Sequence, residues 1–173
     1  MVRVYAVSIP GVLPSACTTW FQAVQACAVS EKRLVRNEEW QRASAGTPDQ
    51  GTDNGTTDCN ISTALSPVNT GSRSSCKSNS GVFDMAGNVH EWVADWADQA
   101  NGGCTDWRSA VGLPSGDLSC FGGDGSGSSD HQVPGALFRG GGFIDGAEAG
   151  VFAVSVLRDP SFSGGNVGFR CAR

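Results

Sequence analysis

Charged residues are scarce in this 173-residue sequence: Asp, Glu, Lys and Arg make up 17% of it, against roughly 25% in an average domain. The 12 basic and 17 acidic residues leave a net charge of −5, which excludes a basic nucleic-acid-binding surface over the whole molecule. No apolar run reaches the roughly 18 residues that a transmembrane helix needs. We therefore expect neither a nucleic-acid partner nor a membrane span.

Histidine and closely paired cysteines are also lacking. The two histidines, His90 and His131, lie far apart, and none of the seven cysteines belongs to a Cys-x-x-Cys pair, so we expect no zinc site. A glycine-rich chain with this many cysteines favours disulfides and an oxidising compartment, although buried, reduced cysteines are the alternative. Because the number is odd, at least one thiol is unpaired or pairs outside the chain.

A signal peptide is not visible, because Tyr5, Ser8 and Pro10 interrupt the apolar residues after Met1. The sequence therefore leaves the localisation open. The cysteine content favours a cell-surface, secreted or phage-associated protein, and the chain can be part of a longer one.

Glycine is abundant, with 24 residues, about twice its usual share of roughly 7%. Five Trp and eight Phe need burial, so the composition indicates one α+β domain over residues 1–173, with short strands and long loops, rather than disorder. One helix is predicted from Thr18 or Thr19 to about Val29, and a second begins at Asn37 as its cap and ends at Gly46.

The rest of the chain alternates polar and apolar segments. The polar segments 46–81 and 101–132 are predicted to be long loops, the first closed by cysteines. Residues 2–8 are predicted to form a first strand, and residues 137–138, 151–156 and 167–173 the closing strands.

The segment Gly81–Trp96 is the most informative. Asp84 and Glu91 flank a turn that contains Gly87, and hard oxygen ligands around a tight turn suit calcium. The alternative is a capped turn anchored by the two tryptophans of the segment, and the residues alone favour this turn over a metal site.

This segment resembles the core signature of the formylglycine-generating enzyme (sulfatase-modifying factor) family. Further matches follow in order along nearly the whole chain: Thr19–Ala23 with Cys27, Lys32–Leu34, Glu38–Trp40, Phe138–Gly142 and Val167–Cys171. The resemblance implies a C-type-lectin-like fold of two helices, short twisted strands and long loops. It also implies a disulfide between Cys27 and Cys171 and a structural calcium ion. The implied calcium ligands are Asp84, Gly87, Val89 and Glu91.

Enzymes of this family oxidise a substrate cysteine with two active-site cysteines that bind copper. Counted from Arg139, the corresponding positions are Asp145 and Gly150, and neither supplies the thiolate that Cu(I) requires. We therefore expect neither copper nor oxidase activity. A second enzyme branch joins sulfur to a histidine betaine with an added helical domain and an iron site. The two histidines and the length of the chain disfavour it.

The tail, about residues 139–173, resembles the variable region of diversity-generating retroelement target proteins. These systems copy a template with errors at adenines, so asparagine codons become many residue types at fixed places. The residues that stand at such places here are Ile144, Asp145, Ser155, Leu157, Arg158, Phe162 and Gly164. Each can arise from an asparagine codon by changing adenines.

The resemblance implies a non-catalytic module that binds a protein or a cell-surface ligand through this variable surface. An apolar residue such as Ile144 beside Asp145 suits partner recognition, and the alternative is that Ile144, Leu157 and Phe162 belong to the core. A sulfatase-modifying-type oxidase and a calcium-dependent lectin of fixed specificity are the rival functions. The pairing of the other cysteines stays open, namely Cys59, Cys76, Cys104 and Cys120.

Overall fold

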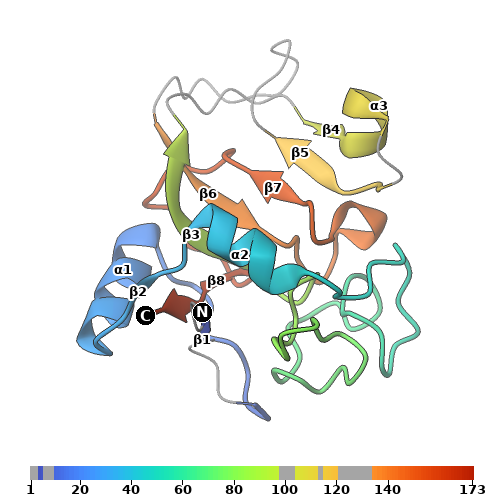
Figure 1. Ribbon diagram of the computed structural model, residues 1–173, viewed down its shortest axis with the longest axis horizontal. Coiled ribbons are helices and arrows are strands. Elements are labelled where there is room, and N and C mark those ends of the chain that lie inside the picture. The colour runs from blue at the N-terminus through green and yellow to red at the C-terminus, as the bar shows by residue number, and fades with distance from the viewer. Residues whose placement is uncertain (1–3, 6–9, 98–103, 113–114, 121–133) are drawn as a thin grey trace.

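The computed structural model describes residues 4–5, 10–97, 104–112, 115–120 and 134–173 (Figure 1). Its elements are β1 (Val4–Tyr5), α1 (Trp20–Val29), β2 (Arg33–Leu34), α2 (Asn37–Ser44), β3 (His90–Ala97), β4 (Thr105–Asp106), α3 (Trp107–Val111), β5 (Leu118–Cys120), β6 (Gly135–Arg139), the 3-10 helix η1 (Gly146–Glu148), β7 (Val154–Ser155), β8 (Val167–Phe169) and β9 (Cys171–Ala172). In the described parts these strands form a small sheet, β1-β9-β2, and a larger one, β4-β5-β7-β6-β3-β8. The α+β class is confirmed.

The two predicted helices are present and begin where they were predicted, although the cap of the second is not the predicted residue. Thr19 caps α1 in a capping box, in which its hydroxyl accepts from the Gln22 N–H and the Gln22 side chain accepts from the Thr19 N–H. In α2 the cap is Arg36, and Asn37 is the first helical residue. The cap prediction was wrong because the Asn37 N–H donates to the Asp95 carboxylate of β3, at 2.6 Å.

Strand β3 is the centre of the larger sheet. It runs antiparallel to β6, with Trp92 opposite Phe138, and parallel to β8, with Trp92 opposite Phe169. Helix α2 lies across the sheet in Figure 1, and α1 lies to one side of β3. The core therefore sits on both sides of β3, with Trp40 of α2 and Trp92 fully buried.

The segment 101–132 is not a simple loop in its described parts. It holds β4, α3 and β5, and Asp106 caps α3 by accepting from the Ser109 N–H at 2.8 Å. Strand β5 adds to the sheet beside β7, with Cys120 opposite Ser155. The polar composition hid these elements because they are short and depend on pairing with distant strands.

The described cysteines form three disulfides, Cys27–Cys171, Cys59–Cys76 and Cys104–Cys120, and leave Cys17 free and exposed. The first one joins α1 to β9, with the two Cα atoms 5.5 Å apart, as the family resemblance implies. The second one closes the 46–81 loop. Within the described residues, no helix is long and apolar enough to cross a membrane.

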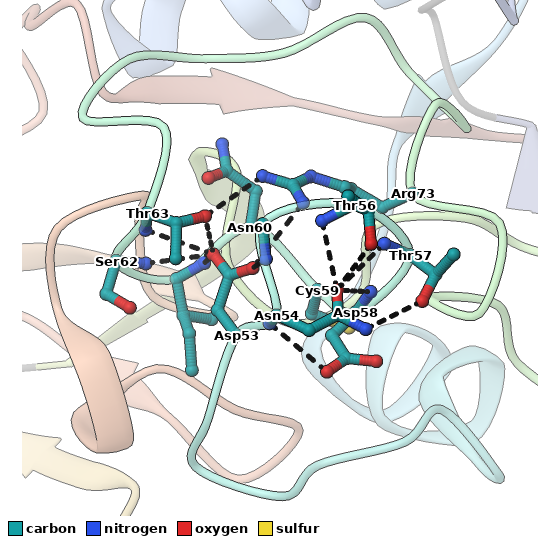
Figure 2. A network of polar contacts seen from close by, with 12 residues as sticks. Asp53, Asn54, Thr56, Thr57, Asp58, Cys59, Asn60, Ser62, Thr63 and Arg73 are labelled. Carbon is teal, nitrogen blue, oxygen red and sulfur yellow. Dashed lines mark hydrogen bonds and ion pairs between the residues drawn. The ribbon is translucent and has the colours of Figure 1, made fainter.

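The 46–81 loop is organised around one buried carboxylate. The Asp53 side chain is shielded from solvent and accepts from the N–H groups of Ile61, Ser62 and Thr63 and from the Thr63 hydroxyl (Figure 2). Arg73 lies 3.5 Å from the same carboxylate. Burial alone raises the pKa of Asp53, but these donors outweigh it and lower the pKa to about 2. A segment without helices is thus held by side-chain-to-backbone bonds.

The Cys27–Cys171 disulfide closes most of the chain into one loop, so its removal should lower the free energy of unfolding by about 3 to 5 kcal/mol. The variant Cys27→Ser/Cys171→Ser is compared with the parent by chemical denaturation. The control Cys17→Ser should unfold like the parent. Equal midpoints for the parent and the double variant would show that the bond does not hold the frame.

Replacing the buried carboxylate, Asp53→Asn, should lower the free energy of unfolding by about 1 to 2 kcal/mol at neutral pH. Because the folded-state pKa of about 2 lies below the ordinary 3.8, the carboxylate stabilises the fold above about pH 4. The difference from the parent should therefore shrink as the pH falls from about 4 to about 2. A difference that stays constant over this range argues against the network.

Candidate functional site

Glu91, an expected calcium ligand, lies in β3 with 5% of its surface exposed. Its carboxylate accepts from the Trp40 indole N–H at 2.6 Å and from the Nε and Nη2 groups of Arg170. Arg170 Nη2 also lies within donor distance of the carbonyl oxygens of Phe83 and Asp84, at 3.2 and 3.4 Å. A guanidinium therefore occupies the space between this carboxylate and the turn that precedes it.

The other three expected ligands are Asp84, by its side chain, and Gly87 and Val89, by their backbone, and all three lie in tightly packed surroundings. The buried Asp84 carboxylate accepts from the Gly71 N–H at 2.9 Å, and burial raises its pKa to about 6. Gly87 has φ of +70°, and a β-carbon there would lie 2.3 Å from the Asn60 carbonyl oxygen, so this glycine is needed for close backbone packing. Val89 is buried in the core.

The Glu91 carboxylate therefore does not fit its place in the implied calcium set. Calcium takes 6 to 8 oxygen ligands, whereas the oxygens of Glu91 face N–H donors. In the described part of the chain, no three His, Cys, Asp or Glu side chains form a group that could hold a metal ion.

Most of the expected variable residues lie on two loops that meet at His90, and we call this set of residues the belt. The belt consists of Ile144, Asp145, Arg158, Phe162 and Gly164, with His90 and Asn166 between its two halves. At one end, Asp145 Oδ2 lies 3.1 Å from His90 Nε2 and accepts from the Gly142 N–H at 2.8 Å. Burial raises the pKa of Asp145, but His90 and the Gly142 N–H outweigh it, so the pKa is lowered.

His90 links the two halves of the belt. The backbone N–H of His90 donates to the Asn166 carbonyl at 2.8 Å. The centroid of its imidazole ring lies 4.9 Å from that of the Phe138 ring. A β-carbon on Gly164 would lie 2.9 Å from Asn166 Oδ1 and 3.0 Å from Phe162 Cζ. Arg158 in turn stacks over the Phe162 ring, 4.7 Å from its centroid. The loops 142–145 and 158–166 thus meet at His90.

Exposure differs along the belt. Ile144 is 58% exposed, and Arg158 is exposed, so both are available to a partner. Asp145 is half-buried, and so is Leu157, which lies two residues after the end of β7. Phe162 is half-buried and packs against the core cluster of Trp92 and Phe138, which agrees in part with its alternative assignment to the core.

Ser155 departs from the expectation of an exposed binding residue. It lies in β7 opposite Phe138, is 8% exposed, and its hydroxyl accepts from the Leu157 N–H at 3.2 Å. It contributes only to the wall of a small pocket that it shares with His90, Phe138 and Asp145. Both residues of β7 are buried, because the strand lies between β5 and β6 in the larger sheet.

The two belt residues that the sequence did not indicate are His90 and Asn166. They meet because β3 runs parallel to β8, with His90 opposite Val167. No spacing in the sequence reveals this pairing, since 77 positions separate the partners. The one feature of the sequence that could have pointed to Asn166 is that it directly precedes the predicted closing strand, residues 167–173.

The positions that correspond to the copper-binding cysteines are filled by other groups. Asp145 is bound to His90, as described above. At Gly150, a β-carbon would lie 2.4 Å from both oxygens of the Asp117 carboxylate, so no larger side chain fits without a shift. Asp117 accepts from the Phe152 N–H at 2.6 Å, and Asp49 accepts from the Val151 N–H at 3.0 Å. Burial, and then the charge of Asp117, raises the pKa of Asp49 to about 6.

Comparison with known proteins identifies the family of the chain. The model of the sulfatase-modifying factor enzyme 1-like domain family matches residues 5–173. No curated protein is detectably similar in sequence.

Solved structures share the fold. The U1 variant of the major tropism determinant matches with a TM-score of 0.60 and 18% identity, over 98% of this chain and 44% of that chain. Treponema denticola variable protein 1 matches with a TM-score of 0.57 and 20% identity, over 98% of this chain and 74% of that one. PvdO from Pseudomonas aeruginosa matches with a TM-score of 0.57 and 22% identity, over 93% of this chain and 62% of that one.

The chain thus spans less than half the length of the tropism determinant. These likenesses confirm the predicted C-type lectin-like fold of the formylglycine-generating enzyme type.

The packing at Gly150 is open to a direct test. Gly150→Ala should lower the free energy of unfolding by about 1 to 3 kcal/mol, because the new methyl group would press on the buried Asp117 carboxylate. Gly165→Ala is the matched control, because nothing lies within 4 Å of its β-carbon position. Denaturant midpoints measure both. Equal stability of the two variants would mean that a side chain fits at position 150, which corresponds to the second copper-binding cysteine.

Proposed function

The chain belongs to the sulfatase-modifying factor enzyme 1-like family, and we propose that it is a non-catalytic binding module whose recognition surface is the belt. The single observation that carries this proposal is the meeting of two loops at His90. It brings together the loops that carry Ile144, Asp145 and Arg158 on a disulfide-linked frame. Function then lies in the residues on the loops and not in the fold.

The belt has the chemistry of a protein-binding surface. An exposed isoleucine, a carboxylate–imidazole pair and an arginine stacked on a phenylalanine combine apolar and charged contacts. Single-residue changes at Ile144 or Arg158 alter this chemistry without entering the core, because both side chains are exposed. The partner we propose is a protein or another ligand on a cell surface.

In the 158–166 half of the belt, backbone hydrogen bonds hold the loop. The Cys17 N–H donates to the Gly164 carbonyl, and the Trp20 N–H donates to the Pro160 carbonyl, each at 3.0 Å. The His90 N–H holds Asn166 in the same way. Such preorganisation lowers the ordering entropy that binding costs, and it lets side chains change while the loop keeps its course.

The names of the structural relatives support variation as the role of the belt. One relative is called a variable protein, and the tropism determinant occurs as several variants. We propose that the tail of this chain is likewise a variable region, diversified by a retroelement. The oxidase function of the family is not proposed, because Asp145 and Gly150 stand where the thiolates are needed and Asp117 fills the space at Gly150.

The DNA around the gene tests the proposal. We expect a reverse transcriptase gene nearby and a near-copy of the sequence that encodes residues 139–173, with mismatches at adenines of the copy. These mismatches should fall in the codons of Ile144, Asp145, Leu157, Arg158 and Phe162. A locus without a second copy, or with mismatches spread over all bases, would refute diversification.

Catalysis is tested separately. The protein is incubated with copper and a cysteine-containing peptide, and the peptide mass is followed for conversion of the thiol to an aldehyde. No turnover is expected, because neither Asp145 nor Gly150 carries a thiolate. Aldehyde formation would establish an oxidase.

A glycan array tests the other rival function. Calcium-dependent sugar binding that survives Ile144→Ala and Arg158→Ala would establish a lectin of fixed specificity instead.

A further inference from the structure

We propose that the guanidinium group of Arg170 takes the place of the structural calcium ion that the family resemblance implies, so that this domain folds without a divalent cation. The proposal concerns the frame, and only its consequence for recognition depends on the proposed function. It stands on the contacts of one buried ion pair.

The pair is formed with two-point geometry. Arg170 offers Nε and Nη2 to the two oxygens of Glu91, a fork that matches a carboxylate. The Trp40 indole N–H adds a third donor at 2.6 Å. An ionised carboxylate has about four acceptor positions, so three donors leave little capacity for a metal.

The same guanidinium serves the turn that precedes β3. Its Nη2 group lies 3.2 Å from the Phe83 carbonyl oxygen and 3.4 Å from that of Asp84. A structural calcium ion does this work with positive charge: it gathers carboxylate and carbonyl oxygens from one turn. Here the charge comes from a side chain of the closing segment.

Because the ion pair is buried, the positive charge of Arg170 matters for stability. Glu91 is 5% and Arg170 is 3% exposed, and the Asp84 carboxylate lies in the same buried region. Removing the guanidinium would leave two buried carboxylates, Asp84 and Glu91, with less positive charge beside them. A divalent cation is the simplest group to compensate such a pair.

The position of the pair connects it to the belt. Arg170 follows β8 directly and precedes Cys171 of the disulfide, and Glu91 is the residue after His90. The pair therefore fixes β3 against β8 at the place where the two halves of the belt meet. If the belt is the recognition surface, a partner is bound equally well with and without calcium.

The test compares the thermal unfolding of the whole chain in excess EDTA and in millimolar calcium chloride. The parent should melt within about 1 °C of the same temperature in both. It should also give no terbium luminescence sensitised by tryptophan, although the Trp40 indole is hydrogen-bonded to Glu91. Arg170→Gln should melt lower than the parent in EDTA and should regain several degrees on addition of calcium, because its carboxylates are then free to bind the ion.

Arg33→Gln is the control, because Arg33 forms a partly exposed ion pair with Glu39 away from the turn. It should melt at the same temperature in both solutions. A parent that melts lower in EDTA than in calcium overturns the proposal, and so does terbium emission that calcium displaces. Both of these measurements use the parent protein, so they do not depend on the folding of a variant. A folded Arg170→Gln that ignores calcium also overturns it. These melting and luminescence experiments do not measure partner binding. A failure of the proposed function is therefore detected separately, by the DNA locus, the peptide-oxidation assay and the glycan array.

Discussion

The buried ion pair between Glu91 and Arg170 is the constraint on which the rest of the structure depends. Through Glu91 it connects helix α2, by way of Trp40, to the central strand β3. Through Arg170 it connects β3 to the closing segment, whose next residue is cross-linked to α1 by the Cys27–Cys171 disulfide. Buried charges are costly unless they are paired, so arrangements that separate Glu91 from Arg170 are disfavoured.

Local signals predicted the parts of the fold that depend on neighbours in sequence. Thr19 with Gln22 is a capping box, and it marked the start of α1 correctly. The same reasoning failed at Asn37, because a carboxylate on β3, distant in sequence, binds its N–H. The short elements β4 and β5 escaped for a similar reason: two or three residues form a strand only when a distant partner supplies the hydrogen bonds.

The candidate site was predictable in its composition but not in its arrangement. The family resemblance indicated the tail residues, and the structure places Ile144 and Arg158 on the surface but Ser155 inside. The meeting of the two loops at His90 follows from the parallel pairing of β3 and β8, which no periodicity encodes. The calcium assignment depended on Glu91 being free, and only coordinates reveal that Arg170 and Trp40 occupy it.

A frame held by buried charges and disulfides can keep its shape while the side chains on its loops change. The most direct measurement is the protease resistance of a displayed library in which the belt residues Ile144, Asp145, Arg158 and Phe162 are randomised together. If these positions only decorate the frame, most members will resist the protease as the parent does. If most members are cleaved, as in a library randomised at buried positions such as Val93 and Val156, the residues belong to the core and the belt is no binding surface.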